Sequence, residues 1–243
     1  MGKLYVAGFG PGNPDNMTEA CRSCLQGADI IVGYTGYISL LRPHFPDKTY
    51  HGTGMTGEAE RCRAAIGLAK AGNTVCVVSS GDGGVYGMAS LIFELAAGMP
   101  DIEIEVIPGV TAAVSGAALL GAPLSNDFAV ISLSDLLTPW ETIARHLRAA
   151  AAGDFAICLY NPGSKKRTGH LREACDILLE TMPSDRLCGI ARNIGRDGQS
   201  VSLMTLGQLR EAQTDMTETV FIGNSQTRNI GGRMVTSRGY RNE

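Results

Sequence analysis

The stretch 75–87 constrains the fold more than any other part of the sequence. An apolar, largely β-branched run at 75–79 leads into a loop with four glycines around one acid, Asp82. Such a run is typical of a strand buried on both faces of a parallel sheet. Glycines allow a sharp turn and close approach of another molecule. Open α/β folds bind ligands at the carboxyl ends of their strands, so this loop is a candidate ligand site. An ordinary strand-to-helix turn has the same pattern.

Composition and charge narrow the class of protein. The chain has 243 residues, of which 44% are hydrophobic and 19% charged, as is typical of a globular protein with one large or two small domains. The formal net charge is −3 and there is no long basic run, so nucleic acid is not expected as a partner. The apolar runs are too short to span a bilayer, so no membrane association is expected.

Seven cysteines are scattered along the chain, several of them in apolar runs. Their odd number and the absence of a signal-peptide pattern favour reduced thiols and a cytoplasmic location. Cys21 and Cys24 form a C-x-x-C pair on a predicted helix. No second pair or histidine cluster accompanies them, so no metal site is expected.

The first half is predicted to alternate strands and helices. A strand at 3–7 ends in a glycine-rich turn, but the dinucleotide fingerprint G-x-G-x-x-G fails because Asn13 stands at its last glycine. The acidic residue that this fingerprint requires after the next strand is also missing. Pro11 lacks an N–H group that could bind phosphate. After a strand at 102–107, a helix of small residues runs to Leu120, which permits close packing against a sheet or another helix.

A turn-rich segment at 121–127 separates a second alternation, so we place two domains at 1–121 and 122–243. The segment 199–205 is expected to pair as a hairpin with the strand at 187–191, which makes the second sheet mixed. T-x-x-E at Thr138 and T-x-x-Q at Thr205 predict capping boxes at two helix starts. The predicted fold class is α/β, in two domains with short connections.

The first half contains three motifs in order: Gly8-x-Gly10-Pro11-Gly12, Ser80-Gly81-Asp82 and Pro108-Gly109-x-Thr111-Ala112. Together they resemble one family, the tetrapyrrole methyltransferases, which methylate uroporphyrinogen and corrin precursors with S-adenosylmethionine. Two segments of the second half, 131–140 and 159–162, are similar to the branch that methylates ring carbon C17 and contracts the macrocycle. The resemblance covers essentially the whole chain and implies two α/β domains with a cleft between them, as a homodimer. Asp82-Gly83 stands where many relatives have Gly-Asp-Pro.

The resemblance also implies the ligands. S-adenosylmethionine would lie between the domains, held largely by backbone groups, and the substrate would be a tetrapyrrole, either metal-free precorrin-3B or cobalt-factor III. The sequence leaves that choice open, with a slight similarity to the cobalt-containing branch. The matching cofactor positions are Pro11, Gly81, Asp82, Thr111, Ala112, Leu159, Tyr160, Ile222 and Gly223.

The chemistry divides the remaining candidates into two groups. Methyl transfer from a sulfonium depends on positioning, whereas ring contraction also needs a proton transfer and hence a general acid or base. Asp135, Ser134 and Tyr160 follow predicted strands of the second domain and are the catalytic candidates. The candidates for holding the carboxylate-rich substrate are Gly10, Gly12, Ser132, Asn161, Lys165, Lys166, Arg167 and Arg192.

Three other functions fit parts of the sequence. A corrin methyltransferase of different regiochemistry would share the glycine motifs, but the segment 132–140 argues against it. A nucleotide-binding oxidoreductase is weakened by Asn13 and the missing acid. A non-catalytic tetrapyrrole carrier would bind the macrocycle without turnover.

The run Lys165-Lys166-Arg167 generates a first testable prediction. Neutralising all three side chains should raise the KM for the tetrapyrrole and weaken its dependence on salt, because the substrate carries many carboxylates. The affinity for S-adenosylmethionine should barely change, which calorimetry measures. An unchanged KM for the tetrapyrrole would identify the run as a solvated loop.

Overall fold

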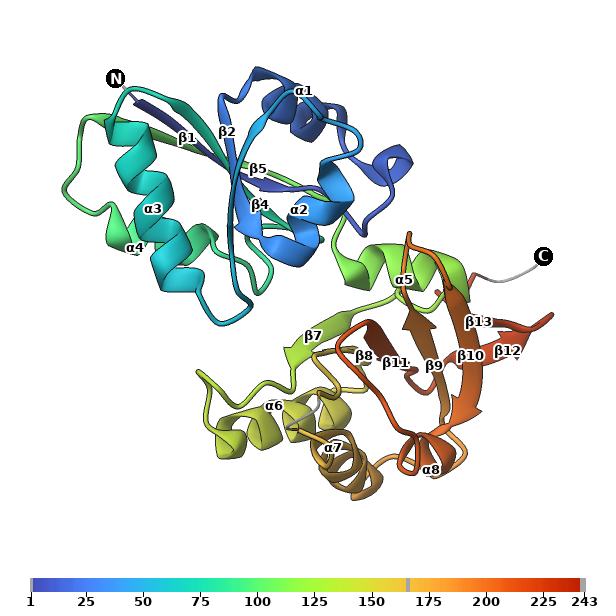
Figure 1. The fold of residues 1–243 in the computed structure, drawn as a ribbon. Helices are drawn as coiled ribbons and strands as arrows, with labels where there is room; N and C mark the ends of the chain where they lie inside the picture. Colours follow the sequence, from blue (N-terminus) through green and yellow to red (C-terminus); the bar gives the residue numbers. More distant parts are fainter. Residues whose placement is uncertain (1, 165–166, 241–243) are drawn as a thin grey trace. The chain divides into compact units, whose positions relative to one another are not determined.

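The computed structural model describes residues 2–164 and 167–240, and the chain divides into two compact units after Thr111 (Figure 1). Each unit combines one main sheet with helices, so the predicted α/β class in two domains is confirmed. Within the described ranges, no helix is both long and apolar enough to cross a membrane.

The first unit is a parallel five-stranded sheet with strand order β3-β2-β4-β1-β5. Its strands are β1 (Gly2–Gly8), β2 (Ile30–Tyr34), β3 (Thr49–Thr53), β4 (Thr74–Ser79) and β5 (Ile102–Ile107). Its helices are the 3-10 helix η1 (Pro14–Asn16), α1 (Glu19–Gly27), α2 (Thr35–Leu41), α3 (Glu58–Lys70) and α4 (Ala89–Leu95).

Strand β4 lies at the centre of this sheet and is buried on both faces, as the sequence predicts. Val75 and Val77 belong to the core beneath α3 and α4, whereas Cys76 and Val78 belong to the core beneath α1 and α2. All four side chains are fully buried. Successive side chains of a strand point to opposite faces of the sheet, so a parallel strand with helices on both faces needs apolar residues at every position.

The second unit has a mixed main sheet with strand order β10-β9-β11-β8-β7, and a small sheet with order β12-β13-β6. In the main sheet β7 and β8 are parallel and the other neighbours antiparallel, including the predicted pair β9 and β10. Its strands are β6 (Gly121–Ala122), β7 (Phe128–Ser132), β8 (Ala156–Tyr160), β9 (Leu187–Arg192), β10 (Ser200–Thr205), β11 (Glu218–Ile222), β12 (Thr227–Ile230) and β13 (Arg233–Thr236). Its helices are α5 (Ala112–Leu120), α6 (Trp140–Ala152), α7 (His170–Leu179) and α8 (Leu206–Leu209).

Helix α5 belongs to the second unit because its small residues pack closely on the second sheet. A Cβ added to Gly116 would lie 2.8 Å from the ring of Phe221. A Cβ on Gly189 of β9 would lie 2.7 Å from the side chain of Leu120. The units therefore divide one helix earlier than the boundary that the turn-rich segment 121–127 suggests.

The two predicted capping boxes have different outcomes. At the start of α8, the Thr205 hydroxyl accepts a hydrogen bond from the Gln208 N–H, and the Gln208 side chain accepts one from the Thr205 N–H. The box predicted at Thr138 is wrong, because α6 begins at Trp140 with Pro139 at the N-cap and no side-chain cap. This shift of one residue places Glu141 at the second helical position, whereas the motif requires the third.

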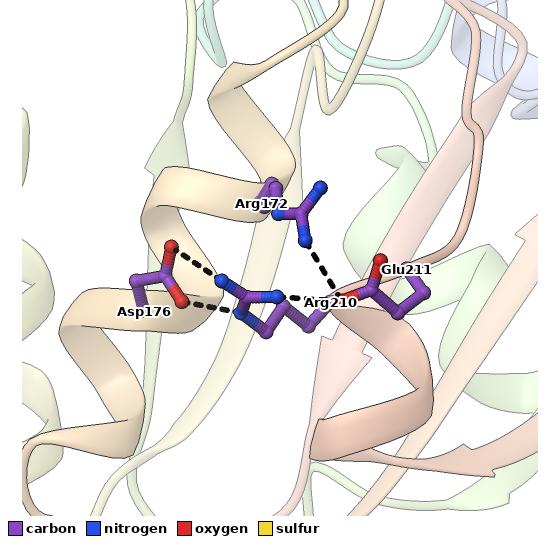
Figure 2. A network of polar contacts seen from close by, with 4 residues as sticks. All are labelled: Arg172, Asp176, Arg210 and Glu211. Carbon is purple, nitrogen blue, oxygen red and sulfur yellow. Dashed lines mark hydrogen bonds and ion pairs between the residues drawn. The ribbon is translucent and has the colours of Figure 1, made fainter.

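An ion-pair network fastens α7 to the segment that follows α8 (Figure 2). The Arg210 guanidinium contacts both carboxylate oxygens of Asp176, and it also contacts Glu211. Arg172 of α7 reaches the same Glu211 oxygen at 3.1 Å. Because the planar guanidinium engages one carboxylate with two nitrogens, the contact restricts the relative orientation of Arg210 and Asp176 as well as their distance. All four side chains are partly exposed, so the network adds only modestly to the packing of α7 beside α8.

Three glycines allow the turns after β1, β4 and β5 to pack backbone against backbone. A Cβ added to Gly109 would lie 2.1 Å from the carbonyl oxygen of Gly81 and 2.3 Å from that of Gly8. A Cβ on Gly8 would lie 2.5 Å from the Gly81 oxygen. These contacts bring the carboxyl ends of three strands together.

Replacing Gly109 with Ala should therefore destabilise the protein by on the order of 3 kcal/mol, because only backbone atoms surround the added methyl group. Chemical denaturation of the variant measures this change. Gly67→Ala is the matched control: Gly67 lies inside α3 with no atom within 4 Å of an added Cβ. That substitution should stabilise the helix by up to about 1 kcal/mol. Equal effects of the two substitutions would contradict this packing argument.

Candidate functional site

The glycine loops after β1 and β4 form one structure. The Gly10 N–H donates to the Gly81 carbonyl oxygen at 3.0 Å, and the Gly81 N–H donates to the Gly10 oxygen at 2.8 Å. Both residues adopt the left-handed region, with φ of 78° and 69°, which glycine adopts without strain. Two motifs about seventy positions apart in the sequence are thus joined by a short antiparallel bridge. Their N–H groups are already engaged within the protein.

Asp82 connects the loop after β4 to the turn after β5. One carboxylate oxygen accepts a hydrogen bond from the Gly84 N–H at 2.7 Å, and the other accepts from the Gly109 N–H at 2.8 Å. The side chain of Asp82 is thus a structural clamp. Its predicted contact with the cofactor stays a prediction, and a carboxylate with two acceptor bonds retains further lone pairs.

Three other predicted positions of the first unit lie along the same turns. Pro11 is buried, Gly12 is half-buried with φ of 134°, and Thr111 is half-buried at the end of the unit. The exposed Gly84 extends this surface. Gly12 and Gly84 leave some backbone accessible without side chains, whereas Gly10 and Gly81 are buried. Accessible main-chain groups suit a ligand recognised largely by the backbone.

In the second unit, one edge of the main sheet gathers most of the predicted residues. Strands β7, β8 and β9 end there with Ser132, Tyr160 and Arg192. Strand β11 runs in the opposite direction and begins at this edge, because Glu218 pairs with Arg192. We call this edge, with the loops that follow β7 and β8, the β7–β8 edge.

Ile222 and Gly223 lie at the opposite edge. Ile222 pairs with Ile157 near the start of β8, and the Gly223 N–H donates to the Leu187 carbonyl oxygen at the start of β9. The structure therefore does not bring these two residues beside Tyr160. Parallel strands have their carboxyl ends at the same edge of a sheet. Because β11 is antiparallel to both of its neighbours, its carboxyl end lies at the other edge.

Hydrogen bonds order the β7–β8 edge. The Ser132 hydroxyl oxygen accepts from the Asn161 side-chain amide at 2.9 Å and from the Ser134 N–H at 3.2 Å. Asn161 has φ of 54°, a left-handed conformation that asparagine tolerates and that turns the chain after β8. The candidates Ser132, Ser134 and Asn161 thus form one connected group.

Tyr160 joins this group to the start of α5. Its hydroxyl oxygen accepts a hydrogen bond from the Ala113 N–H at 2.8 Å, so the phenol lies beside the first turn, which begins at Ala112. Leu159 has no exposed side-chain surface and belongs to the core under α6 and α7. A contact of Leu159 with a ligand would therefore have to use its backbone.

Asp135 faces a partner that the sequence analysis missed. The Nε2 atom of His170 lies 3.1 Å from the Asp135 Oδ2 atom. A hydrogen bond from His170 is the largest cause that lowers the pKa of the Asp135 carboxyl, and the charge of Arg167 lowers it further. The His170 ring packs edge-on against Trp140, with centroids 4.9 Å apart. No sequence motif links Asp135 and His170, which stand 35 positions apart in the chain.

The predicted cations have different surroundings. Lys165 and Lys166 lie outside the described residues. Arg167 is half-buried, and within the described ranges no acceptor bonds its Nη1 atom. Arg192 is paired with Asp215 at 3.0 Å and lies 3.8 Å from Glu218. An anionic ligand at Arg192 would have to compete with these two carboxylates.

The cysteines are all free and buried. Desolvation raises the pKa of Cys21 to about 12 and that of Cys62 to about 11, which keeps these thiols protonated at neutral pH. In the part of the chain that the structure describes, no three histidine, cysteine or acidic residues are grouped so that they could hold a metal ion.

Comparison with known proteins gives a consistent picture. Residues 3–210 match the family described as Tetrapyrrole (Corrin/Porphyrin) Methylases. A probable cobalt-factor III C(17)-methyltransferase of Salmonella typhimurium is 46% identical, covering 98% of this chain and 99% of its own length. A precorrin-3B C(17)-methyltransferase of Sinorhizobium is 39% identical, covering 93% of this chain and 91% of its own length.

Solved structures share the fold. The crystal structure of the methyltransferase CobJ superposes with a TM-score of 0.90 at 40% identity, covering 98% of this chain and all of that one. A uroporphyrin-III C-methyltransferase from Thermus thermophilus, solved with S-adenosylhomocysteine, has a TM-score of 0.70 at 20% identity, over 91% of this chain and 92% of that one.

The contact between Asp135 and His170 generates a testable prediction. His170→Phe keeps a ring against Trp140 but removes the N–H group, so the pKa of the Asp135 carboxyl should rise toward its ordinary range. Carboxyl NMR titration measures it, with His146→Phe on the exposed side of α6 as the control. A carboxyl whose pKa is lower in the folded than in the unfolded protein stabilises the fold at pH values above its unfolded pKa. This contribution is lost as the pH falls through the folded pKa. The variant should lack that acid-sensitive contribution, and an unmoved pKa would contradict the assignment.

Proposed function

Because the chain belongs to the tetrapyrrole (corrin/porphyrin) methylases, we propose that it methylates C17 of a corrin precursor with S-adenosylmethionine and contracts the macrocycle. The resemblance seen in the sequence is confirmed, since relatives named for C17 methyl transfer are 39% to 46% identical over nearly the whole chain. The observation that carries the proposal is this similarity at matching length, from the first glycine turn to the last strands.

The turns of the first unit support S-adenosylmethionine as the methyl donor. We propose Pro11, Gly81, Asp82, Thr111 and Ala112 as positions that line its site. Gly10 and Gly81 would shape the site through their mutual bridge, because their N–H groups donate to each other's carbonyl oxygens. Backbone recognition suits a ligand with an adenosine and an amino-acid part, and an S-adenosylhomocysteine complex is known for a structure of the same fold.

At the β7–β8 edge, the substrate would meet polar and cationic groups. Ser132, Ser134 and Asn161 offer hydrogen-bonding atoms. Arg167 offers a positive charge, but its Nη1 atom, which has no acceptor among the described residues, is buried, so a substrate carboxylate would reach it only after the side chain turned outward. We propose cobalt-factor III as the first substrate to test, because the Salmonella relative with that name is 46% identical and the precorrin-3B relative 39%. Any cobalt would arrive inside the macrocycle.

Two further expectations accompany this function. As for the family, we expect a homodimer, which sedimentation velocity measures. We also expect the enzyme to work in the cytoplasm, where its buried thiols stay reduced.

The decisive experiment supplies both tetrapyrroles in parallel. Purified protein is incubated with S-adenosylmethionine and either cobalt-factor III or precorrin-3B, and the product is followed by mass spectrometry and absorption spectrum. A gain of one methyl group together with a contracted-ring spectrum is expected for one substrate. Binding without methyl transfer would indicate a carrier, and methylation without contraction by the unmodified protein would indicate a methyltransferase of different regiochemistry.

Gly81 provides a test of the cofactor site. Gly81→Ala strains a backbone with φ of 69° beside the proposed ligand, so the affinity for S-adenosylmethionine should fall at least tenfold, about 1.4 kcal/mol. Gly72→Ala is the matched control, since Gly72 also has a positive φ, of 93°, but lies before β4 with no atom near an added Cβ. Calorimetry should show normal affinity in the control. Equal losses in both variants would indicate general destabilisation and contradict the site.

A further inference from the structure

We propose that His170, oriented by Asp135, is the general base that accepts the proton which the methylated macrocycle must lose before its ring contracts. The inference rests on the proposed function and deepens it. It assigns a residue that the sequence analysis did not single out, and it changes the role of Asp135 from acid or base to positioning residue.

The geometry gives the imidazole a defined orientation. The Nε2 atom lies 3.1 Å from the Asp135 carboxylate. In the neutral ring that the proposal requires, a hydrogen on Nε2 would face this carboxylate and the lone pair would lie on Nδ1. Among the described residues, none hydrogen-bonds to Nδ1. Edge-on packing against Trp140 restricts rotation of the ring. A base held by a carboxylate on one nitrogen and open on the other is the arrangement that general-base catalysis uses.

The surroundings favour a functional position for this pair. Asp135 follows β7 and His170 opens α7, so two chain segments meet at the β7–β8 edge beside the group of Ser132 and Asn161. Asp135 retains 39% of its side-chain exposure and His170 19%, which leaves the pair within reach of a ligand at the surface. The ion pairs of Arg172 and Asp176 fasten α7, the helix that carries His170 (Figure 2).

Asp135 is suited to orienting the histidine and poorly suited to donating a proton. Its contact with His170 and the nearby charge of Arg167 lower the pKa of the carboxyl, so it stays ionised at neutral pH. An ionised carboxylate beside an imidazole stabilises the imidazolium that forms when the ring accepts a proton.

The proton step balances without another reagent. An electron-rich ring carbon attacks the sulfonium methyl group, a carbon–carbon bond forms, and the sulfur–methyl bond breaks with its electron pair left on sulfur. The positive charge of the sulfonium thereby moves to the ring system, and this added charge is removed when one ring proton leaves. The Nδ1 lone pair accepts that proton, and the resulting imidazolium pairs with Asp135. Methyl transfer itself needs no base, so the two steps are separable by mutation.

The test uses two substitutions of His170 in the full chain. His170→Gln retains an N–H group for Asp135 but cannot accept the proton, so contraction should slow by roughly 10²- to 10⁴-fold. Release of S-adenosylhomocysteine should stay near the normal rate, and a methylated, uncontracted macrocycle should accumulate in the mass spectrum. His170→Ala leaves space for a small base, so added imidazole should restore contraction in part. His146→Ala, on the exposed side of α6, is the control and should contract normally without imidazole.

Asp135→Asn separates the two roles of the pair. If Asp135 only orients the ring, contraction should fall less than in His170→Gln and should not respond to imidazole. A normal rate of contraction in His170→Gln would overturn the proposal. So would equal losses of methyl transfer and contraction with no rescue in folded His170→Ala, because that outcome indicates a structural role. Failure of the unmodified protein to methylate either tetrapyrrole would instead overturn the proposed function, and this inference with it.

Discussion

Backbone-to-backbone contact among the turns after β1, β4 and β5 is the constraint on which the first unit depends. Gly8, Gly81 and Gly109 approach so closely that a methyl group on Gly8 or Gly109 would overlap a carbonyl oxygen. Asp82 then closes the contact through hydrogen bonds to two N–H groups. The Gly-rich turns are thus shaped by each other before any ligand is bound. Turns held in this way are ordered by the chain itself, which would reduce the free energy lost in ordering a loop at the proposed S-adenosylmethionine site.

The second unit depends on the direction of its strands. Parallel β7 and β8 deliver the residues that follow them to one edge, where Asp135 and His170 meet although 35 positions separate them in the sequence. Antiparallel β11 carries Ile222 to the other edge. One reversed strand therefore decides which candidates can act together and which cannot.

Several features follow from local sequence alone. The central position of β4 was predictable, because an apolar run that fills both faces has few other uses in an α/β protein. The cap at Thr205 was also predictable, since its two hydrogen bonds involve residues only three positions apart. The cap predicted at Thr138 was wrong because Pro139 takes the N-cap position. The motif does not determine which of two neighbouring residues becomes the N-cap. The two units divide before α5 because α5 packs against Phe221, and the alternation of strands and helices in the sequence does not show this packing.

The sequence by itself determined the α/β class, the glycine turns at the strand ends and the family, since each depends on residue types at short, fixed spacings. Only the tertiary structure decided that Asp82 clamps Gly109, that Arg192 is paired with Asp215, and that Asp135 faces His170. These are contacts between segments far apart in the chain. Their existence depends on strand order and direction, and neither periodicity nor composition records which loops a sheet will bring to the same edge.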